Sequence, residues 1–160
     1  AQALQRGWVV FSPAAPSGGS LWYDDLSTAL VPAIIDWIET WVHPEGGAVH
    51  VVGVSNGGLS AFEVATLVPD RVRSLLVFPG YPRSDAAVAG LGELVDVPIR
   101  MFVGGDDDGW RDAMQATFAT LTDLGGDVTF EIVPDEGHII EALSDGVRIF
   151  DELDAIRTSD

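Results

Sequence analysis

Short apolar runs rich in β-branched and aromatic residues alternate along the chain with stretches of helical periodicity. The runs that predict strands are residues 8–11, 49–54, 74–78, 99–103 and 128–133. The first four are apolar at nearly every position, which is typical of strands covered on both faces in a parallel sheet. We therefore predict an α/β fold with a mostly parallel sheet of about five strands and helices on both faces.

The segments between these runs predict the helices. The first carries apolar side chains three or four residues apart, at Leu26, Leu30, Ile34, Trp37 and Trp41, and Pro32 should kink or restart it. Further helices are expected over residues 56–68, over a stretch from Trp110 that ends before Gly125, and over residues 145–156. Residues 81–98 give no clear pattern and predict a loop with a short helix.

The composition fits one globular domain, residues 1–160. Apolar residues make up 47% of the chain and charged residues 21%, a balance typical of folded proteins. We find no linker or repeat, and no apolar run approaches the ~20 residues of a membrane span. The first residues, AQALQRGW, lack a long apolar core with a cleavage site, so we expect a cytoplasmic location.

Charge and cysteine content narrow the chemistry. The net charge is −17 and there is no Lys, which disfavours nucleic acid and anionic membranes as partners and favours neutral or cationic ligands. The alternative interpretation is that the net charge of −17 is an adaptation to solubility or habitat that is unrelated to the ligand, and it explains the charge equally well. There is no Cys, which excludes disulfides and thiolate chemistry. Catalysis would depend on Ser, His and carboxylates.

Reactive side chains follow three of the predicted strands. Ligands of parallel α/β sheets bind beyond the carboxyl ends of the strands. Ser55 follows the second run, GGDDDGW (residues 104–110) follows the fourth, and PDEGH (residues 134–138) follows the fifth. The order along the chain is Ser, Asp, His.

Ser55 lies in the sequence VVGVSNGG, which matches G-x-S-x-G between a strand and a helix. A nucleophile on a tight turn needs neighbours without side chains, so Gly53 and Gly57 are expected to give clearance. Its hydroxyl would then stand at a helix N-terminus, where backbone N–H groups can meet an oxyanion. A structural or phosphate-binding turn is the alternative, and the phosphate version lacks G-x-G-x-x-G or a following Lys.

The candidate base and acid come from the two later turns. His138 in the EGH turn can reach a serine beyond a neighbouring strand, whereas we interpret His43 and His50 as structural. Asp106, Asp107 and Asp108 are adjacent, and one of them can point at the imidazole; we choose Asp107 and expect its neighbours to cap the next helix. The pattern does not fit a calcium loop, so we expect no metal.

The motifs taken together resemble the α/β-hydrolase superfamily, most nearly its small carboxylesterase and phospholipase-like esterases. The carrying segments run almost from end to end: GWVVFSPAAP, WYDD, VVGVSNGG, RVRSLLVFPGYP, GGDDDGW and PDEGH. The resemblance implies Ser55 as nucleophile, His138 as base and Asp107 as acid.

One element of these esterases has no counterpart in the chain. In the family, an earlier strand ends in a loop that donates the second oxyanion N–H, and no such segment is found here. We therefore expect an N-terminally truncated or processed hydrolase, in which a missing N-terminal segment or a second chain completes the sheet. The alternative is a minimal version, in which the Trp8 strand fills the gap and residues 12–14 provide the donor.

These observations predict a serine hydrolase that cleaves small neutral carboxylic esters without a cofactor. The backbone N–H of Asn56 would hold part of the oxyanion, and Trp22, Tyr23, Tyr81 and Trp110 would line the substrate pocket. The same triad would serve a thioesterase, lipase or peptidase. The alternatives from other classes are a catalytically silent hydrolase-like domain that binds a small molecule or partner, and a flavodoxin-like binding module.

Overall fold

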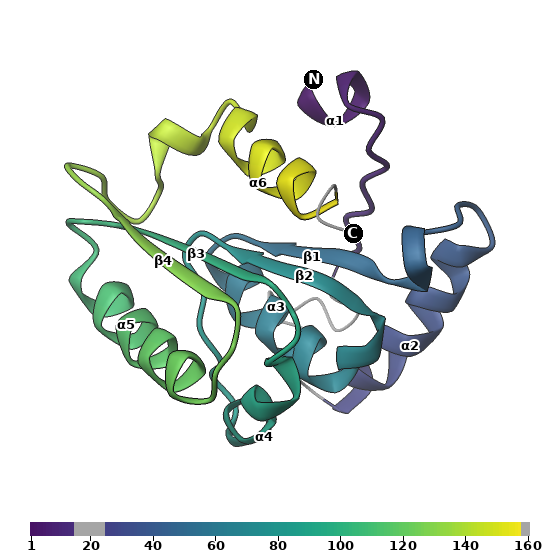
Figure 1. Ribbon diagram of the computed structural model, residues 1–160, viewed down its shortest axis with the longest axis horizontal. Helices are drawn as coiled ribbons and strands as arrows, with labels where there is room; N and C mark the ends of the chain where they lie inside the picture. The colour runs from purple at the N-terminus through teal and green to yellow at the C-terminus, as the bar shows by residue number, and fades with distance from the viewer. Residues whose placement is uncertain (15–24, 158–160) are drawn as a thin grey trace.

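A four-stranded parallel sheet forms the centre of the molecule (Figure 1). The structure is a computed structural model that describes residues 1–14 and 25–157. Its strands are arranged in chain order, and their bounds are β1 (Val49–Gly53), β2 (Val72–Val77), β3 (Ile99–Gly104) and β4 (Val128–Val133). The predicted α/β class and the parallel direction of the strands are confirmed.

The strand register places alternate side chains on opposite faces of the sheet. Leu75 of β2 lies opposite Val51 of β1 and Ile99 of β3, and it belongs with Ile99 to the larger core cluster. Leu76, the next residue, faces the other way and packs with Leu153. Both faces are therefore buried, as near-continuous apolar strands require.

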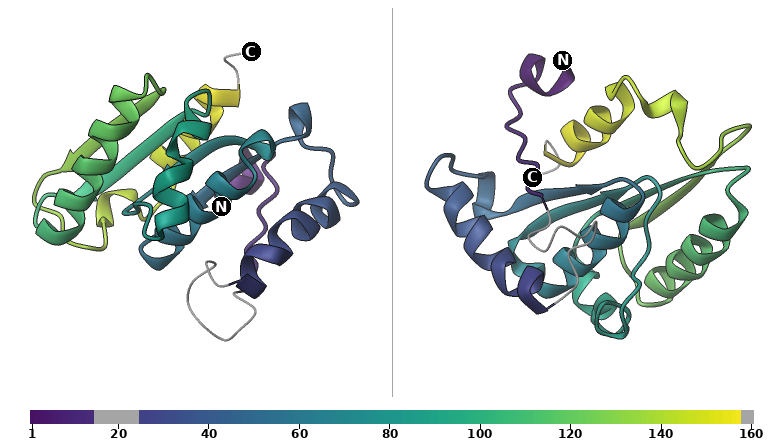
Figure 2. Two further views of the ribbon diagram at one scale, coloured as in Figure 1. Left: turned by 90° about the horizontal axis from the view of Figure 1, so that it is seen from below. Right: turned by 180° about the vertical axis from the view of Figure 1, so that it is seen from behind.

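Helices cover both faces, as predicted. The helices are α1 (Gln2–Gln5), α2 (Asp25–Glu39), α3 (Asn56–Leu67), α4 (Asp85–Ala89), α5 (Asp108–Asp123) and α6 (Val147–Arg157). Figures 1 and 2 show α6 on one face, with α3 and α5 on the other. The stretch 81–98 contains α4, the short helix expected there.

The buried stripe of α2 differs from the predicted one. Among the side chains that the structure describes in this helix, those of residues 29–39, Val31, Ile35 and Ile38 are buried. Trp37 is 53% exposed and Trp41, just beyond the helix, is 69% exposed. The side chain of Leu26 lies outside the described part. The helix also continues past Pro32. The segment is apolar on most of its circumference, so its sequence contains two possible apolar faces with nearly the same residue spacing. Tertiary packing decides which of the two faces is buried.

The predicted strand at residues 8–11 is wrong. This segment pairs with no strand in the described part of the chain, and Val9 and Val10 are 60% and 65% exposed. A β-rich run becomes a strand when a neighbour satisfies its backbone groups, and local propensity cannot supply that neighbour.

Trp8 instead anchors the N-terminal segment to α6. Its indole N–H donates to Asp154 at 2.9 Å, and Arg157 lies over its ring at 4.6 Å. Arg6 bonds the same carboxylate at 2.8 Å, and this hydrogen bond is the main reason that the pKa of Asp154 is lowered. The contacts hold α1 beside α6, away from the carboxyl ends of the strands (Figure 1).

Candidate active site

Ser55 occupies a strained turn between β1 and α3. Its φ is +55°, a left-handed conformation that costs a serine on the order of 1–3 kcal/mol. A Cβ at Gly53 would collide with the backbone of Gly57, so the turn requires glycine at position 53. A Cβ at Gly57 would meet nothing within 4 Å. Both glycines were expected to give clearance. The backbone requires the absence of a side chain at Gly53, whereas at Gly57 a Cβ would meet no atom of the protein.

His138 lies in the turn after β4 and reaches across to Ser55. Its Nε2 is 2.7 Å from the Ser55 Oγ, and its Nδ1 is 2.7 Å from Oδ2 of Asp107. A Cβ at Gly104, the last residue of β3, would strike the backbone of Gly137, so this glycine lets the His138 turn cross the end of β3. The structure thus brings together the three side chains named from the sequence.

Three neighbouring acids have three different environments. The Asp107 side chain is 14% exposed and turns towards the imidazole. Asp108, 80% exposed, pairs with Arg111 at 2.6 Å on the first turn of α5. Asp106 is exposed, and its backbone N–H donates to the carbonyl of Glu136 at 2.9 Å. Among the three, Asp107 faces His138.

Two of the aromatic residues predicted to line the pocket lie beside the imidazole. The Trp110 ring on α5 is 4.9 Å from the His138 ring, and Tyr81 meets Trp110 edge-on at 5.2 Å. All three side chains are partly exposed. Tyr81 and Trp110 thus form a wall next to His138. Trp22 and Tyr23 lie outside the described residues.

A buried carboxylate that was not predicted from the sequence anchors the loop carrying Tyr81. Glu63 on α3 is 6% exposed and accepts hydrogen bonds from the Ser84 N–H at 3.0 Å and the Ser84 hydroxyl at 2.6 Å. The Ser84 hydroxyl in turn accepts the Ala87 N–H and caps α4. The sequence did carry a signal for this contact, since Glu63 is an acid within the apolar helix at residues 56–67. A buried carboxylate needs hydrogen-bond partners.

The other two histidines lie away from this site. His43 is exposed. His50 lies in β1, where its Nδ1 is 2.7 Å from the fully buried Ser74 Oγ. Burial lowers the pKa of His50 to about 4, assisted by the positive charges of Arg73 and Arg157. At neutral pH this imidazole is uncharged and forms part of the packing under Trp8.

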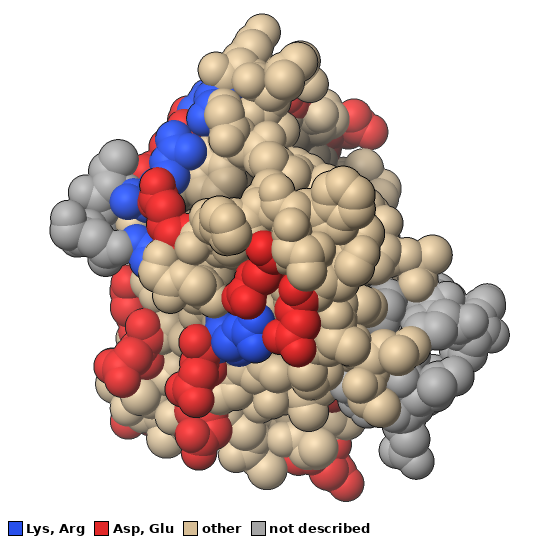
Figure 3. Space-filling model, turned by 90° about the vertical axis from the view of Figure 1, so that its right-hand side faces the viewer, with Lys and Arg blue, Asp and Glu red and all other residues tan. Residues whose placement is uncertain are grey.

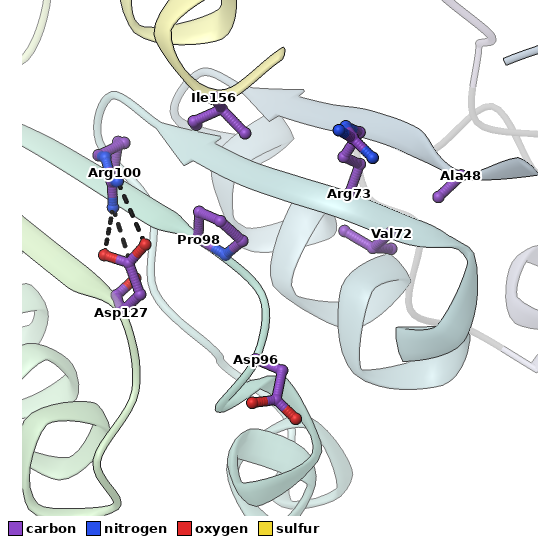
Figure 4. A pocket seen from close by; sticks show the side chains of 8 residues that line it. All are labelled: Ala48, Val72, Arg73, Asp96, Pro98, Arg100, Asp127 and Ile156. Carbon is purple, nitrogen blue, oxygen red and sulfur yellow. Dashed lines mark hydrogen bonds and ion pairs between the residues drawn. The ribbon is translucent and has the colours of Figure 1, made fainter. Parts of the chain in front are cut away.

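A separate hollow of about 340 Å³ lies at the opposite end of the sheet (Figure 4). Its lining includes Ala48, Pro98 and Asp127, each just before a strand. Arg100 is paired there with Asp127 at 3.0 Å. The hollow therefore belongs to the amino ends of the strands and contains none of the three site residues.

No helix in residues 1–14 or 25–157 has the length and apolarity needed to cross a bilayer. Within the same ranges, no three His, Asp or Glu side chains are grouped so that they could hold a metal ion.

The hydrogen-bonded chain of hydroxyl, imidazole and carboxylate, formed by Ser55, His138 and Asp107, is an arrangement that can activate a serine for nucleophilic attack.

The sequence matches no model of a known protein family and no curated protein. Solved structures match over most of the chain. A dienelactone hydrolase from Anabaena variabilis is 24% identical with a TM-score of 0.61, and the match covers 79% of this chain and 57% of that one. Acyl-protein thioesterase 2 from Zea mays is 19% identical, with a TM-score of 0.58 and coverage of 92% and 70%.

An uncharacterized protein from Bacillus cereus has a TM-score of 0.69 at 20% identity, with 93% of this chain and 53% of that chain covered. This chain shares the α/β fold of these solved structures, which is the fold that the resemblance drawn from the motifs implies. The chain spans little more than half the length of the dienelactone hydrolase and the Bacillus protein.

Proposed function

We propose that this protein is a serine hydrolase that cleaves carboxylic esters through an acyl-enzyme intermediate. The observation that carries the proposal is the continuous hydrogen-bonded path from Ser55 Oγ through His138 to Asp107, with 2.7 Å at both steps. The path lies at the carboxyl ends of β1, β3 and β4, where ligands of parallel sheets bind. The fold shared with known hydrolases supports the same class.

In the proposed reaction, Nε2 of His138 takes the proton from Ser55 as Oγ attacks the ester carbonyl carbon. Asp107 accepts the Nδ1 hydrogen bond and stabilises the imidazolium that forms. The tetrahedral intermediate expels the alcohol, which receives the proton from His138, and leaves Ser55 acylated. Water then loses a proton to His138 and attacks the acyl carbon. The second tetrahedral intermediate expels the Ser55 Oγ, which takes this proton back from His138, and the carboxylic acid is released.

The oxyanion of the intermediate needs hydrogen-bond donors placed before the reaction. Asn56 is the first residue of α3 and directly follows Ser55, so its backbone N–H lies at a helix N-terminus. There the helix dipole favours negative charge. We assign the Asn56 N–H as one donor, worth on the order of 10²–10³ in rate.

The environment of the site favours a small, neutral ester. The net charge of −17 disfavours anionic substrates such as acyl-CoA. The aromatic wall of Tyr81 and Trp110 offers apolar contact to the acyl or alcohol group. A thioesterase, lipase or peptidase would use the same three residues and differ in the pocket.

Hydrolysis of p-nitrophenyl acetate by the purified chain tests the proposal. We expect turnover that Ser55→Ala abolishes, because the nucleophile is removed. Ser74→Ala is the matched control, since Ser74 also bonds a histidine but is fully buried in β2. Turnover that survives Ser55→Ala would contradict the proposal. Folded protein with no turnover would favour the catalytically silent hydrolase-like domain.

A further inference from the structure

The loop that carries His138 connects β4 to η4 (Glu141–Leu143), a short 3₁₀-helix that precedes α6. Figure 1 shows this loop side by side with the loop after β3, at the left of the molecule. The backbone of residues 137–139 bonds no other backbone group in the described part of the chain. His138 nevertheless lies 2.7 Å from both Ser55 and Asp107. Its position therefore depends on what holds the residues that flank it.

The carboxylate of Glu136 closes the chain around His138. Its Oε2 accepts the Glu141 N–H at 2.9 Å, and its Oε1 accepts the Ala142 N–H at 3.0 Å. These N–H groups begin η4, and the first N–H groups of a helix have no partner within it. Ile140, the N-cap residue of η4, makes no side-chain cap. Glu136 supplies the missing acceptors from five residues upstream, and hydrogen bonds to a carboxylate are stronger than neutral ones.

The backbone of Glu136 is bonded to the loop that carries Asp107. The Glu136 carbonyl accepts the N–H of Asp106, the residue before Asp107, at 2.9 Å. The same carbonyl passes directly over Gly104, where a Cβ would strike it. One residue therefore joins the loop of the acid, the loop of the base and η4. Because His138 follows Glu136 by two residues, these contacts determine where the imidazole lies.

Acidic side chains are abundant in this protein, so an acid at the start of a helix is not informative by itself. The chain contains 25 Asp and Glu, and Figure 3 shows clusters of them on one face of the molecule. Asp145, for example, accepts the Val147 N–H at 2.8 Å at the start of α6. That bond lies within three consecutive residues. The bonds of Glu136 differ because they span the residues that carry His138.

We propose that Glu136 is a positioning residue for the base of the proposed reaction. By closing the loop, its carboxylate keeps Nε2 of His138 at the Ser55 hydroxyl while Nδ1 donates to Asp107. The inference rests on the proposed function and deepens it, because it concerns the same three side chains. A displacement of about 1 Å in a reacting group can lower the rate about 10²-fold, so the loss of this closure should be measurable.

Steady-state hydrolysis of p-nitrophenyl acetate by three variants tests this role. We expect Glu136→Ala to lower kcat about 10²-fold with little change in KM, because the closed loop aligns the base and not the substrate. Glu136→Gln keeps the side-chain length and one acceptor oxygen, so it should recover part of kcat. Asp145→Ala removes a helix cap elsewhere and should retain the wild-type kcat. Wild-type kcat in Glu136→Ala, or an equal loss in Asp145→Ala, would overturn the proposal.

NMR of protein that contains nitrogen-15-labelled histidine gives a second measurement, which needs no turnover. The chain has three histidines, and the signals lost in His138→Asn identify His138. In slightly alkaline solution, the neutral wild-type ring should carry its proton on Nδ1 alone, and Asp145→Ala should match it. Glu136→Ala should show a mixture of the two tautomers. A ring that keeps the Nδ1 proton in Glu136→Ala would refute the positioning role.

The two measurements separate this inference from the proposed function. A wild-type protein that shows no turnover, but whose His138 tautomer depends on Glu136, would contradict the proposed function alone. Circular dichroism verifies that each variant folds. If Glu136→Ala does not fold, the comparison rests on Glu136→Gln. Wild-type kcat together with an unchanged tautomer in Glu136→Gln would then overturn the proposal.

Discussion

The molecule contains two serine–histidine hydrogen bonds of the same length in very different surroundings. Ser55 and His138 are 2.7 Å apart at the carboxyl ends of the strands, and Ser74 and His50 are 2.7 Å apart within the sheet. Both pairs place a serine hydroxyl within hydrogen-bond distance of an imidazole nitrogen, which is the geometry of an activated serine nucleophile. The hydrogen bond therefore does not distinguish a reactive serine from a structural one.

The surroundings of the two pairs make the distinction. His138 has a carboxylate on its second nitrogen, and both members of its pair are partly exposed. His50 lies near Arg73 and Arg157, which disfavour its protonation, and Ser74 is fully buried. A base must accept a proton and a nucleophile must meet substrate. We expect the first pair to be chemically active and the second to stabilise the fold.

Replacing each histidine should give the largest difference between the pairs. We expect His138→Asn to lower kcat/KM by a factor on the order of 10⁴–10⁶, as loss of the base does in serine hydrolases. His50→Asn should leave kcat/KM unchanged. The measurement is p-nitrophenyl acetate hydrolysis, with circular dichroism to verify folding. A similar loss in both variants would remove the distinction.

The carboxylate should account for the next largest effect. Asp107→Asn is expected to lower kcat by a factor on the order of 10³–10⁴, because the amide no longer holds the imidazole in the required tautomer or stabilises its charge. Asp106→Asn, an exposed neighbour, is the matched control and should retain full kcat. Steady-state kinetics measures kcat for the two variants. A large fall in kcat for Asp106→Asn, with Asp107→Asn little changed, would contradict the assignment of Asp107 as the acid.

The aromatic contact of His138 should have a smaller effect. Trp110→Leu removes a ring 4.9 Å from the imidazole, and a contact of this kind is worth about 0.5–1.5 kcal/mol, so kcat/KM should fall about two- to tenfold. Phe118→Leu on the same helix breaks a contact with Phe130 away from the site and should leave kcat/KM unchanged. Identical kinetics for both variants would show that Trp110 serves packing alone.

The pair of His50 and Ser74 should affect how the free energy of unfolding depends on pH. The pKa of His50 is about 4 in the folded protein, below its ordinary value of 6.5, so the unfolded chain binds more protons between these values. Its contribution to stability is therefore complete above about pH 6.5 and is lost as the pH falls towards 4.

His50→Gln removes this titration. Between pH 7.5 and pH 5, the wild-type protein should lose about 1–2 kcal/mol more unfolding free energy than the variant. Urea denaturation at the two pH values measures the difference. Equal losses would show that His50 titrates normally in the fold.

Much of the fold could be predicted because its signals are local. The runs at residues 49–54, 99–103 and 128–133 are strands within one residue of their predicted bounds. Ser55, the acidic cluster and His138 stood out because each follows a strand, and parallel topology brings the strand ends to one edge. Their hydrogen bonds could not be read from the sequence.

The remaining features depend on tertiary partners. Residues 8–11 have the composition of a strand but lack a neighbouring strand among the described residues. The choice of Asp107 among three adjacent acids depends on which of them faces His138. The bond from Ser84 to Glu63 joins residues 21 positions apart, and no periodic pattern encodes that contact.

Covalent labelling with a fluorophosphonate, followed by mass spectrometry of the digested protein, tests the central claim most directly. The reagent reacts with an activated serine. We predict one adduct, on the peptide that contains Ser55, which is absent from Ser55→Ala and retained in Ser74→Ala. An adduct on a different serine, or no adduct on well-folded protein, would contradict the assignment of Ser55 as nucleophile.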